Sequence, residues 1–291
     1  MNYRHAFHAG NFADVVKHIV LARCIEHLKA KSAPFRVIDT HAGIGLYDLS
    51  GEAAERTGEW RAGIGRLLAA EFSDRIKALI RPYLDTIQAT RAAHGPHSYP
   101  GSPEVARFLT RSEDRLILIE KHPADRARLA ENLAFDGRAK IIEIDAWVGL
   151  KAFIPPKERR GLVLIDPPFE EAGEFGRLST SIFHAHRKWP TGIYALWYPL
   201  KDAGAVADFI GTIQTSRIPK MLSLEFRTKA PTRVPSLFGC GIVIINPPWR
   251  LSGELSEILP ELSNLLALGD GAGWNCEWLT ESVAETFKSG E

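Results

Sequence analysis

The chain has 291 residues, of which 45% are hydrophobic and 24% charged, a composition typical of a globular protein with a large core. The 36 basic residues nearly balance the 35 acidic ones, so the formal net charge of +1 excludes a strongly cationic protein that coats any polyanion. The sequence holds no run of about 18 apolar residues, and its polar start MNYRHAFHAGNF lacks the apolar core of a signal peptide. We therefore expect a cytoplasmic protein that does not act in a membrane.

The N-terminal part is rich in histidine and leads into a predicted helix at residues 13 to 30, ADVVKHIVLARCIEHLKA. Histidines at 5, 8, 18 and 41 suggest a metal site, but no HExxH motif, cysteine partner or cluster of carboxylates accompanies them. We therefore expect no metal. On the helix, His18 is predicted at the edge of the apolar face, and its neighbour Lys17 favours a place at the mouth of a pocket.

Apolar runs that are typical of strands recur along the chain, and most of them end in a polar residue. They are FRVIDTHAG (35 to 43), RLILIEKH (115 to 122), AKIIEIDA (139 to 146), GLVLIDPP (161 to 168), GIYALWYP (192 to 199), KMLSLEF (220 to 226) and CGIVIINPP (240 to 248). Predicted helices alternate with them, for example at 124 to 135 and 252 to 268. This alternation predicts an α/β fold of the Rossmann-like class, with a mainly parallel sheet covered on both faces and a ligand site beyond the carboxyl ends of the strands.

The interval between the first and second predicted strands is too long for one strand-helix unit. Residues 51 to 98 show helical patterns and little strand signal, so they are predicted to form a small helical insertion subdomain. HSYPGSPEVARFL, from residue 97 on, is expected to return the chain to the sheet. The Rossmann-like domain then consists of residues 1 to 50 and 99 to 291.

The three cysteines, Cys24, Cys240 and Cys276, are odd in number and form no CxxC pair. Neither a disulfide framework nor a zinc-cysteine site is indicated, and we interpret them as buried free thiols.

A glycine turn, DTHAGIGLYD, follows the first strand, where Gly43 and Gly45 allow the backbone to approach a ligand closely. The dinucleotide fingerprint requires a third glycine where this chain has Asp48, and no GxxxxGK[ST] phosphate loop occurs. Glu120 ends the second strand, where an acid can accept from ribose hydroxyls, and Asp145 ends the third, where it can accept from an adenine amine. The series predicts a pocket for an adenosine-containing ligand, and S-adenosylmethionine fits best.

Two similar stretches end strands: DPPF at residues 166 to 169 and NPPW at residues 246 to 249. Asp166 follows the glycine turn and the two acids in successive strand-helix units, which predicts that DPPF is the catalytic copy beside the sulfonium. Asn246 is expected on a terminal antiparallel strand pair at the far side of the sheet, with Trp249 capping the core.

The longer motifs resemble the RlmJ family of 23S ribosomal RNA adenine-N6 methyltransferases. They are NYRHAFHAGNFADVVKH, DTHAGIG, ERTGEW, YPGSP, RRGLVLIDPPFE, YALWYP and INPPW, and they extend from Asn2 to Trp249. The resemblance implies that His18, His41, Ser102, Glu120, Asp145 and Ala146 contact S-adenosylmethionine, that Asp166 is the catalytic acid and that Tyr3 contacts the RNA. Ala146 stands where the family often has glycine, and Phe169 stands where tyrosine is common.

Methyl transfer to an adenine requires orientation of a poorly nucleophilic amine. We expect Asp166 and the carbonyl of Pro167 to accept the two N6 hydrogens, so that the nitrogen lone pair points at the methyl group. Phe169 offers a ring for stacking a base that has left its helix.

The predicted partner is 23S ribosomal RNA, with a monomeric protein that needs no obligate protein partner. Three locally basic segments, at 155 to 161, 215 to 220 and 225 to 233, are sufficient to bind a phosphate backbone, although each is also consistent with a solvated loop. Two alternatives remain open: an amino-methyltransferase acting on a protein glutamine or on cytosine N4, and a non-catalytic RNA-binding protein.

Overall fold

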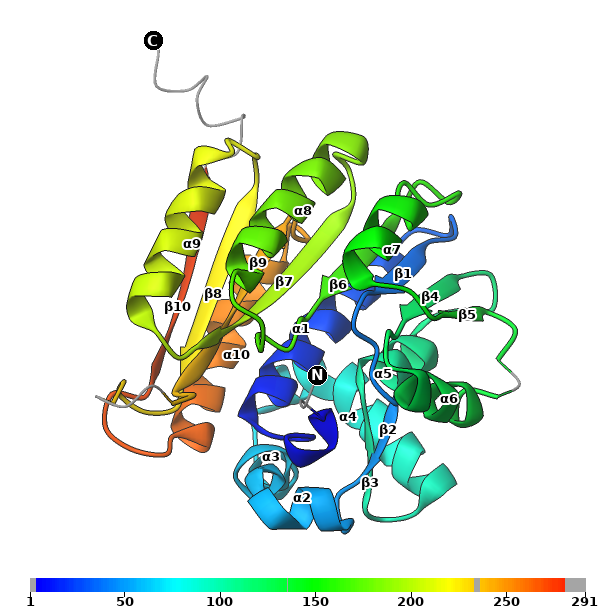
Figure 1. The fold of residues 1–291 in the computed structure, drawn as a ribbon. Coiled ribbons are helices and arrows are strands. Elements are labelled where there is room, and N and C mark those ends of the chain that lie inside the picture. Colours follow the sequence, from blue (N-terminus) through cyan, green and yellow to red (C-terminus); the bar gives the residue numbers. More distant parts are fainter. Residues whose placement is uncertain (1–3, 135, 233–235, 281–291) are drawn as a thin grey trace.

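The computed structural model describes residues 4 to 134, 136 to 232 and 236 to 280. Its strands are β1 (Arg36–Asp39), β2 (Leu46–Asp48), β3 (Ser98–Pro100), β4 (Arg115–Ile119), β5 (Ala139–Ile142), β6 (Gly161–Ile165), β7 (Ile193–Leu200), β8 (Met221–Arg227), β9 (Gly239–Ile245) and β10 (Gly273–Thr280). Eight of these strands form one sheet in the order β10-β8-β9-β7-β6-β1-β4-β5, and β2 pairs with β3 separately (Figure 1). All seven strands predicted from the sequence are present.

The central sheet is parallel from β5 through β4, β1 and β6 to β7. β9 runs antiparallel to both β7 and β8, and β10 runs antiparallel to β8. The predicted fold class, α/β with a mainly parallel sheet, is therefore confirmed. Strand order reverses between β1 and β6, and in such sheets a crevice forms beyond the carboxyl ends of the two strands at this point.

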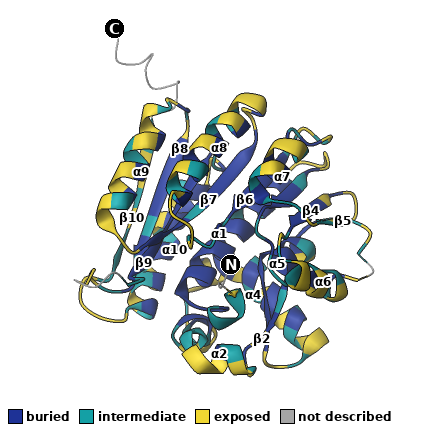
Figure 2. Ribbon diagram, in the orientation of Figure 1, coloured by how far each residue is buried: buried dark blue, intermediate teal, exposed yellow. Residues whose placement is uncertain are grey.

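Helices cover both faces of the sheet. They are α1 (Phe12–Lys29), α2 (Glu52–Thr57), α3 (Arg66–Ala69), α4 (Asp74–His94), α5 (Ser102–Leu109), α6 (Pro123–Asn132), α7 (Ala146–Phe153), α8 (Glu174–Lys188), α9 (Ala203–Thr215) and α10 (Leu251–Leu266), with a 3₁₀ turn η1 (His5–Phe7) and a π turn η2 (Arg61–Gly65). Alternate residues of β6 pack on opposite sides: Leu162 and Leu164 join the core with α1 and α10, whereas Val163 and Ile165 join the core with α7, α8 and α9. Figure 2 shows the buried strands between helices whose outer faces are exposed. None of the described helices has the length and apolar character that a membrane span requires.

α1 is the central helix of the molecule. The side chain of Asn11 caps it by accepting from the backbone N–H groups of Ala13 and Asp14, at 3.0 and 3.1 Å. One side of α1 faces the sheet, and α4, α5 and η2 cover much of the rest, so even Lys17 and His18 are buried. The expectation that His18 lies at the edge of an apolar face is wrong, because residues from the predicted insertion also cover this side of the helix.

The helices α2, α3 and α4 lie in the chain between β2 and β3, whose pairing brings the two ends of this segment together. In η2, the N–H of Ile64 donates to the carbonyl of Gly10 at 2.8 Å, and a Cβ atom at Gly63 would lie 2.2 Å from that carbonyl oxygen. The segment is thus packed directly against the start of α1. Its separation as a subdomain with boundaries at 51 and 98 stays a prediction. Residues after 97 do not return straight to the main sheet, since β3 and α5 precede β4.

The second proline motif lies beyond the amino ends of the parallel strands, whereas the first lies beyond their carboxyl ends, because β9 runs antiparallel to β7. The Asn246 carboxamide donates to the carbonyls of Pro190 and Gly192, each at 2.8 Å. Two expectations need correction. The β8–β9 pair is not terminal, because β10 lies outside it, and Trp249 does not cap the core, because its side chain is 75% exposed.

Two of the three free cysteines, Cys24 and Cys240, are buried as predicted, whereas Cys276 on β10 is only half-buried. β10 is an edge strand in which buried residues do not alternate clearly with exposed ones, and it was not predicted.

Candidate active site

A cavity of about 410 Å³ opens where the carboxyl ends of β1, β4, β5, β6 and β7 meet, a volume typical of small-molecule sites. Most of the residues predicted for the site line it: His41, Gly43, Ser102, Glu120, Asp145, Ala146, Asp166 and Pro167. His18 and Phe169 are not among its lining residues, and Tyr3 lies outside the described residues.

The glycine turn after β1 is fixed to Glu120 at the end of β4. Gly43 has a positive φ of 60°, and its N–H donates to Oε2 of Glu120 at 2.9 Å. The N–H of His122 donates to Oε1 at 2.7 Å. Burial raises the pKa of Glu120, although these two hydrogen bonds act against the shift. Each carboxylate oxygen keeps lone-pair capacity for a further donor, so the pair suits a ligand with two adjacent hydroxyls.

Asp145 begins α7 as its cap. Its Oδ1 accepts from the N–H groups of Trp147 and Val148, at 3.0 and 3.4 Å, and its Oδ2 lies 3.3 Å from the ammonium of Lys121. Burial alone would raise the pKa of Asp145, but Lys121 and the helix N–H groups lower it below its usual value. Asp145 is thus an anion beside the pocket, and Ala146 follows it at the wall.

Ser102 and the start of the turn are held by Asp39, a buried acid that sequence reasoning did not assign to the site. The Ser102 hydroxyl donates to Oδ2 of Asp39 at 2.6 Å, and the N–H of His41 donates to Oδ1 at 3.2 Å. Burial raises the pKa of Asp39 to about 6, although both hydrogen bonds oppose the shift. Asp39 therefore positions two pocket residues from behind the wall.

His41 presents a neutral ring to the cavity. Burial lowers its pKa to about 4, so the imidazole is uncharged at neutral pH. Its Nδ1 lies 2.9 Å from the hydroxyl of Thr40, and its ring packs edge-on against Trp147 with centroids 5.8 Å apart. A neutral ring at this position does not repel a cationic ligand.

A chain of polar contacts leads from His5 in η1 through Asp14 and Lys17 to Asp166. The Lys17 ammonium lies 2.6 Å from Oδ2 of Asp166 and 2.9 Å from Oδ1 of Asp14, and Nε2 of His5 lies 2.9 Å from Oδ2 of Asp14. Burial alone would lower the pKa of Lys17, but the two carboxylates raise it well above its usual value. The helix therefore carries a permanent cation beneath the first acid of DPPF.

Sequence reasoning named Lys17 only as a neighbour of His18 and did not consider Asp14. The available signal was a pair of charged residues within the apolar run ADVVKHIV, since a lysine in a buried segment requires an acidic partner.

His18 does not lie at the pocket mouth, where it was expected, and its contact with the cofactor stays a prediction. Its side chain is 0% exposed, and Nδ1 lies 3.1 Å from the hydroxyl of Tyr99, which in turn lies 2.9 Å from the hydroxyl of Tyr83. Burial lowers the pKa of His18 to about 3, so it stays neutral in the core behind the pocket.

The ring of Phe169 packs beside the cavity. Its centroid lies 4.8 Å from that of Phe175 and 6.1 Å from that of Trp197. Trp197, Pro199 and Leu237 supply the aromatic and apolar surface on this side of the pocket. Stacking of a substrate base on Phe169 stays a prediction. In the described part of the chain, no cluster of three or more histidine, cysteine, aspartate or glutamate side chains is arranged to hold a metal ion.

Comparisons with known proteins identify the family of the chain. The family described as "Ribosomal RNA large subunit methyltransferase D, RlmJ" matches residues 32 to 280. The chain is 39% identical to ribosomal RNA large subunit methyltransferase J of Escherichia coli (strain K12), over 93% of this chain and 96% of the relative. It is 38% identical to the Haemophilus influenzae protein of the same name, over 96% and 99%. A crystal structure of a Legionella pneumophila protein superimposes with a TM-score of 0.83 at 31% identity, covering 93% of this chain and 98% of that one. The chain therefore belongs to the RlmJ family of ribosomal RNA large subunit methyltransferases.

Proposed function

We propose that the protein transfers a methyl group from S-adenosylmethionine to N6 of an adenine in 23S ribosomal RNA. The observation that carries the proposal is Asp166 at the carboxyl end of β6, paired with a buried lysine and exposed to a cavity at the switch point of the sheet. The substrate class is supported by the relatives, which are named as large-subunit ribosomal RNA methyltransferases.

The half of the cavity beneath β1, β4 and β5 has the donors and acceptors that S-adenosylmethionine requires. Glu120 offers two oxygens to the ribose hydroxyls, and the turn at Gly43 allows close approach of the ligand. Three acids that follow β4 and β5 line this side: Glu120, Asp125 and Asp145. Their negative charge complements a ligand that carries a sulfonium and an ammonium group. When bound there, S-adenosylmethionine supplies the electrophilic methyl group.

The other half of the cavity suits a flat amine-bearing base. Lys17 contacts Oδ2 of Asp166, and Oδ1 has no hydrogen bond to any described residue, so it can accept from an amine. The carbonyl of Pro167, beside it in the wall, is the second acceptor in the proposal. Two acceptors on the two amine hydrogens draw the nitrogen toward tetrahedral geometry, so that its lone pair is less delocalised into the ring and points at the methyl group. The resulting in-line geometry lowers the barrier by removing the entropy cost of orientation.

The amine becomes strongly acidic once it has been methylated, so no unusually basic group is needed to take its proton. In the proposal Asp166 takes the proton, and the contact with Lys17 holds the side chain of Asp166 in place.

A glutamine amide or cytosine N4 presents the same planar amine, and the pocket lining alone fits either. The family of the chain favours ribosomal RNA over protein. A non-catalytic RNA-binding protein would not need a buried lysine paired with the first acid of DPPF, because burying the two charges costs free energy of desolvation. We include in the proposal a monomeric protein that acts in the cytoplasm, and sedimentation at several protein concentrations tests the assembly state.

The direct test incubates the full-length protein with methyl-labelled S-adenosylmethionine and deproteinised 23S ribosomal RNA, followed by nuclease digestion and identification of the labelled nucleoside. The expected product is N6-methyladenosine. Label in N4-methylcytidine, or in a protein fraction added to a parallel reaction, would show that the acceptor is cytosine or a protein and not adenine. Tight cofactor binding without any labelled product would favour the non-catalytic protein.

A further inference from the structure

The loops at the amino ends of the parallel strands bring together basic segments that are far apart in the sequence. The loop before β6 contains Lys157, Arg159 and Arg160, and the loop before β8 contains Arg217 and Lys220. Both were noted as basic in the sequence. Because β6 and β8 run in the same direction in one sheet, these loops lie along the same edge, opposite the cavity.

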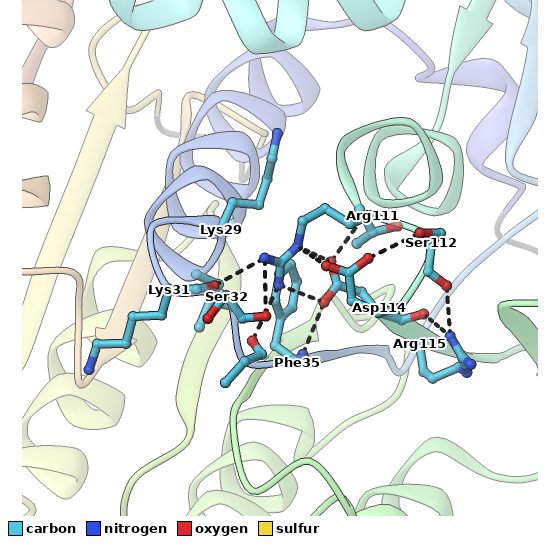
Figure 3. A network of polar contacts seen from close by, with 12 residues as sticks. Lys29, Lys31, Ser32, Phe35, Arg111, Ser112, Asp114 and Arg115 are labelled. Carbon is cyan, nitrogen blue, oxygen red and sulfur yellow. Dashed lines mark hydrogen bonds and ion pairs between the residues drawn. The ribbon is translucent and has the colours of Figure 1, made fainter.

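Direct contacts connect the pieces of this edge. The Arg160 guanidinium donates to the carbonyls of Leu28 and Ala33, which hold it against the end of α1. Arg111 donates to the carbonyls of Lys31 and Ala33, at 3.1 and 3.2 Å, and pairs with Asp114. In Figure 3 the side chains of Lys29 and Lys31 point away from this network. Arg111 and Arg160 therefore hold neighbouring loops together through hydrogen bonds, whereas the side chain of Lys31 stays on the surface.

At the other end of the row, the N–H of Asn246 donates to the carbonyl of Lys220 at 3.0 Å. Asn246 adopts a positive φ of 52°, and its side chain is fixed by the two carbonyls before β7. The NPPW motif is thus held firmly and presents Trp249, which is 75% exposed, with the Arg250 guanidinium 4.5 Å from its ring centroid.

Positive charge predominates along this edge. Six exposed cations named here form no ion pair with any residue that the structure describes: Lys31, Lys157, Arg159, Arg217, Lys220 and Arg250. By contrast, four exposed cations of the segment between β2 and β3 each pair with a glutamate: Arg56, Arg61, Arg75 and Lys77.

Positive charge also predominates around His27, near the end of α1. Burial lowers its pKa, and three cations lower it further, whereas one acid, Glu254, opposes them; the cations are Lys31, Arg160 and Arg250. These three cations, from three separate segments, are therefore close enough to act on one imidazole.

We propose that this amino-edge surface, defined by Lys31, Arg159, Lys220, Trp249 and Arg250, is a second RNA-binding site that holds ribosomal RNA outside the segment entering the cavity. Lysine and arginine suit phosphates, and an exposed ring beside arginine suits an unstacked base. The proposal rests on the proposed function for the identity of the RNA.

The surface is separated from the cavity by the five residues of β6, a span of about 16 Å. An RNA that only fills the pocket does not reach it, so its contribution depends on RNA length.

The test compares the wild type with the triple variant Arg159→Glu/Lys220→Glu/Arg250→Glu, with Trp249→Ala, and with Arg81→Glu as a control. Arg81 is an exposed residue of α4 with no ion pair in the described part of the chain. Dissociation constants are measured over a range of KCl concentrations for a long 23S rRNA fragment, for a short oligonucleotide with the target adenine, and for S-adenosylmethionine.

The triple variant should bind the long RNA at least about ten-fold more weakly, and its salt dependence should fall by about two in log–log slope, as expected for three lost phosphate contacts. Trp249→Ala should weaken the same binding by about five-fold. Binding of the short oligonucleotide and of S-adenosylmethionine should not change, which also shows that the variants are folded.

The proposal would be overturned if the triple variant bound the long RNA with the affinity and salt dependence of the wild type. It would also be overturned if Arg81→Glu lost as much affinity for the long RNA as the triple variant. Polyglutamate binding is measured in the same way. If the triple variant lost as much affinity for polyglutamate as for RNA, and Trp249→Ala did not affect RNA binding, the surface would bind any polyanion and the proposal would be overturned. If the wild type methylates no RNA, the proposed function fails, whereas these binding measurements still decide the surface.

Discussion

The ammonium of Lys17 lies 2.6 Å from a carboxylate oxygen of Asp166, although the two residues are 149 positions apart in the chain. Lys17 is 5% exposed and Asp14 is 1% exposed, so the cation and both of its acidic partners are shielded from water on the helix side. The contact joins the N-terminal helix to the DPPF motif. It fixes one oxygen of the acid and leaves the other for a substrate.

Replacing Lys17 by methionine should reduce kcat by at least about a hundred-fold, because Asp166 loses its orientation and Asp14 loses its cation. The broken buried pair should also lower the free energy of unfolding by about 3 to 5 kcal/mol. Arg23→Met is the matched control, since Arg23 on the same helix forms a largely buried pair with Glu254 away from the cavity. A Lys17→Met protein that is folded and turns over like Arg23→Met would refute a role for Lys17 in the reaction.

Glu120→Ala should weaken S-adenosylmethionine binding by at least about ten-fold, because two hydroxyls lose a charged acceptor and each such hydrogen bond is worth roughly 1.5 to 3 kcal/mol. Glu120→Gln keeps one acceptor oxygen and should have a smaller effect. Glu59→Ala, which alters the cavity wall near His8, serves as the control. Calorimetry measures all three, and an unchanged dissociation constant for Glu120→Ala would remove Glu120 from the cofactor site.

Asp39 should make stability depend on pH in a defined direction. Its folded-state pKa of about 6 lies above the ordinary value of 3.8, so the folded protein retains a proton that the unfolded chain has lost. The contribution of Asp39 is complete below about pH 4 and is lost as the pH rises through 6. Relative to Asp39→Asn, the wild type should lose about 2.4 kcal/mol of unfolding free energy between pH 4 and pH 7. Parallel curves for the two proteins in urea unfolding would show that Asp39 does not titrate in this way.

The parts of the structure that the sequence predicted are those fixed by local pattern. Buried parallel strands appear as continuous apolar runs, so β6 at Gly161–Ile165 was found close to its observed bounds. β10 was missed because an edge strand such as Gly273–Thr280 lacks both a continuous run and a clear alternation. Glu120, Asp145 and Asp166 were placed at the pocket for the same reason, since polar residues at the carboxyl ends of parallel strands lie close together. His41, Ser102 and Ala146 came instead from the family resemblance.

Contacts between distant segments could not be predicted in this way. The spacing of apolar residues along α1 does not reveal that helices from a later segment enclose it. For this reason His18 was expected at the pocket and not in the core. The exposure of Trp249 likewise depends on which segments pack around the end of β9, and the local sequence does not specify them.

The central claim is that DPPF, and not NPPW, carries methyl transfer to adenine N6. The most direct measurement is the rate of N6-methyladenosine formation in 23S rRNA by Asp166→Ala and Asn246→Ala, with S-adenosylmethionine affinity and unfolding measured on the same samples. Asp166→Ala should stay folded and lose nearly all transfer, because alanine can neither orient the amine nor accept its proton. Asn246→Ala removes hydrogen bonds to two carbonyls at the opposite edge of the sheet, so it should lose stability and keep most of its turnover. A folded but inactive Asn246→Ala protein, together with an Asp166→Ala protein that still methylates adenine, would contradict the account.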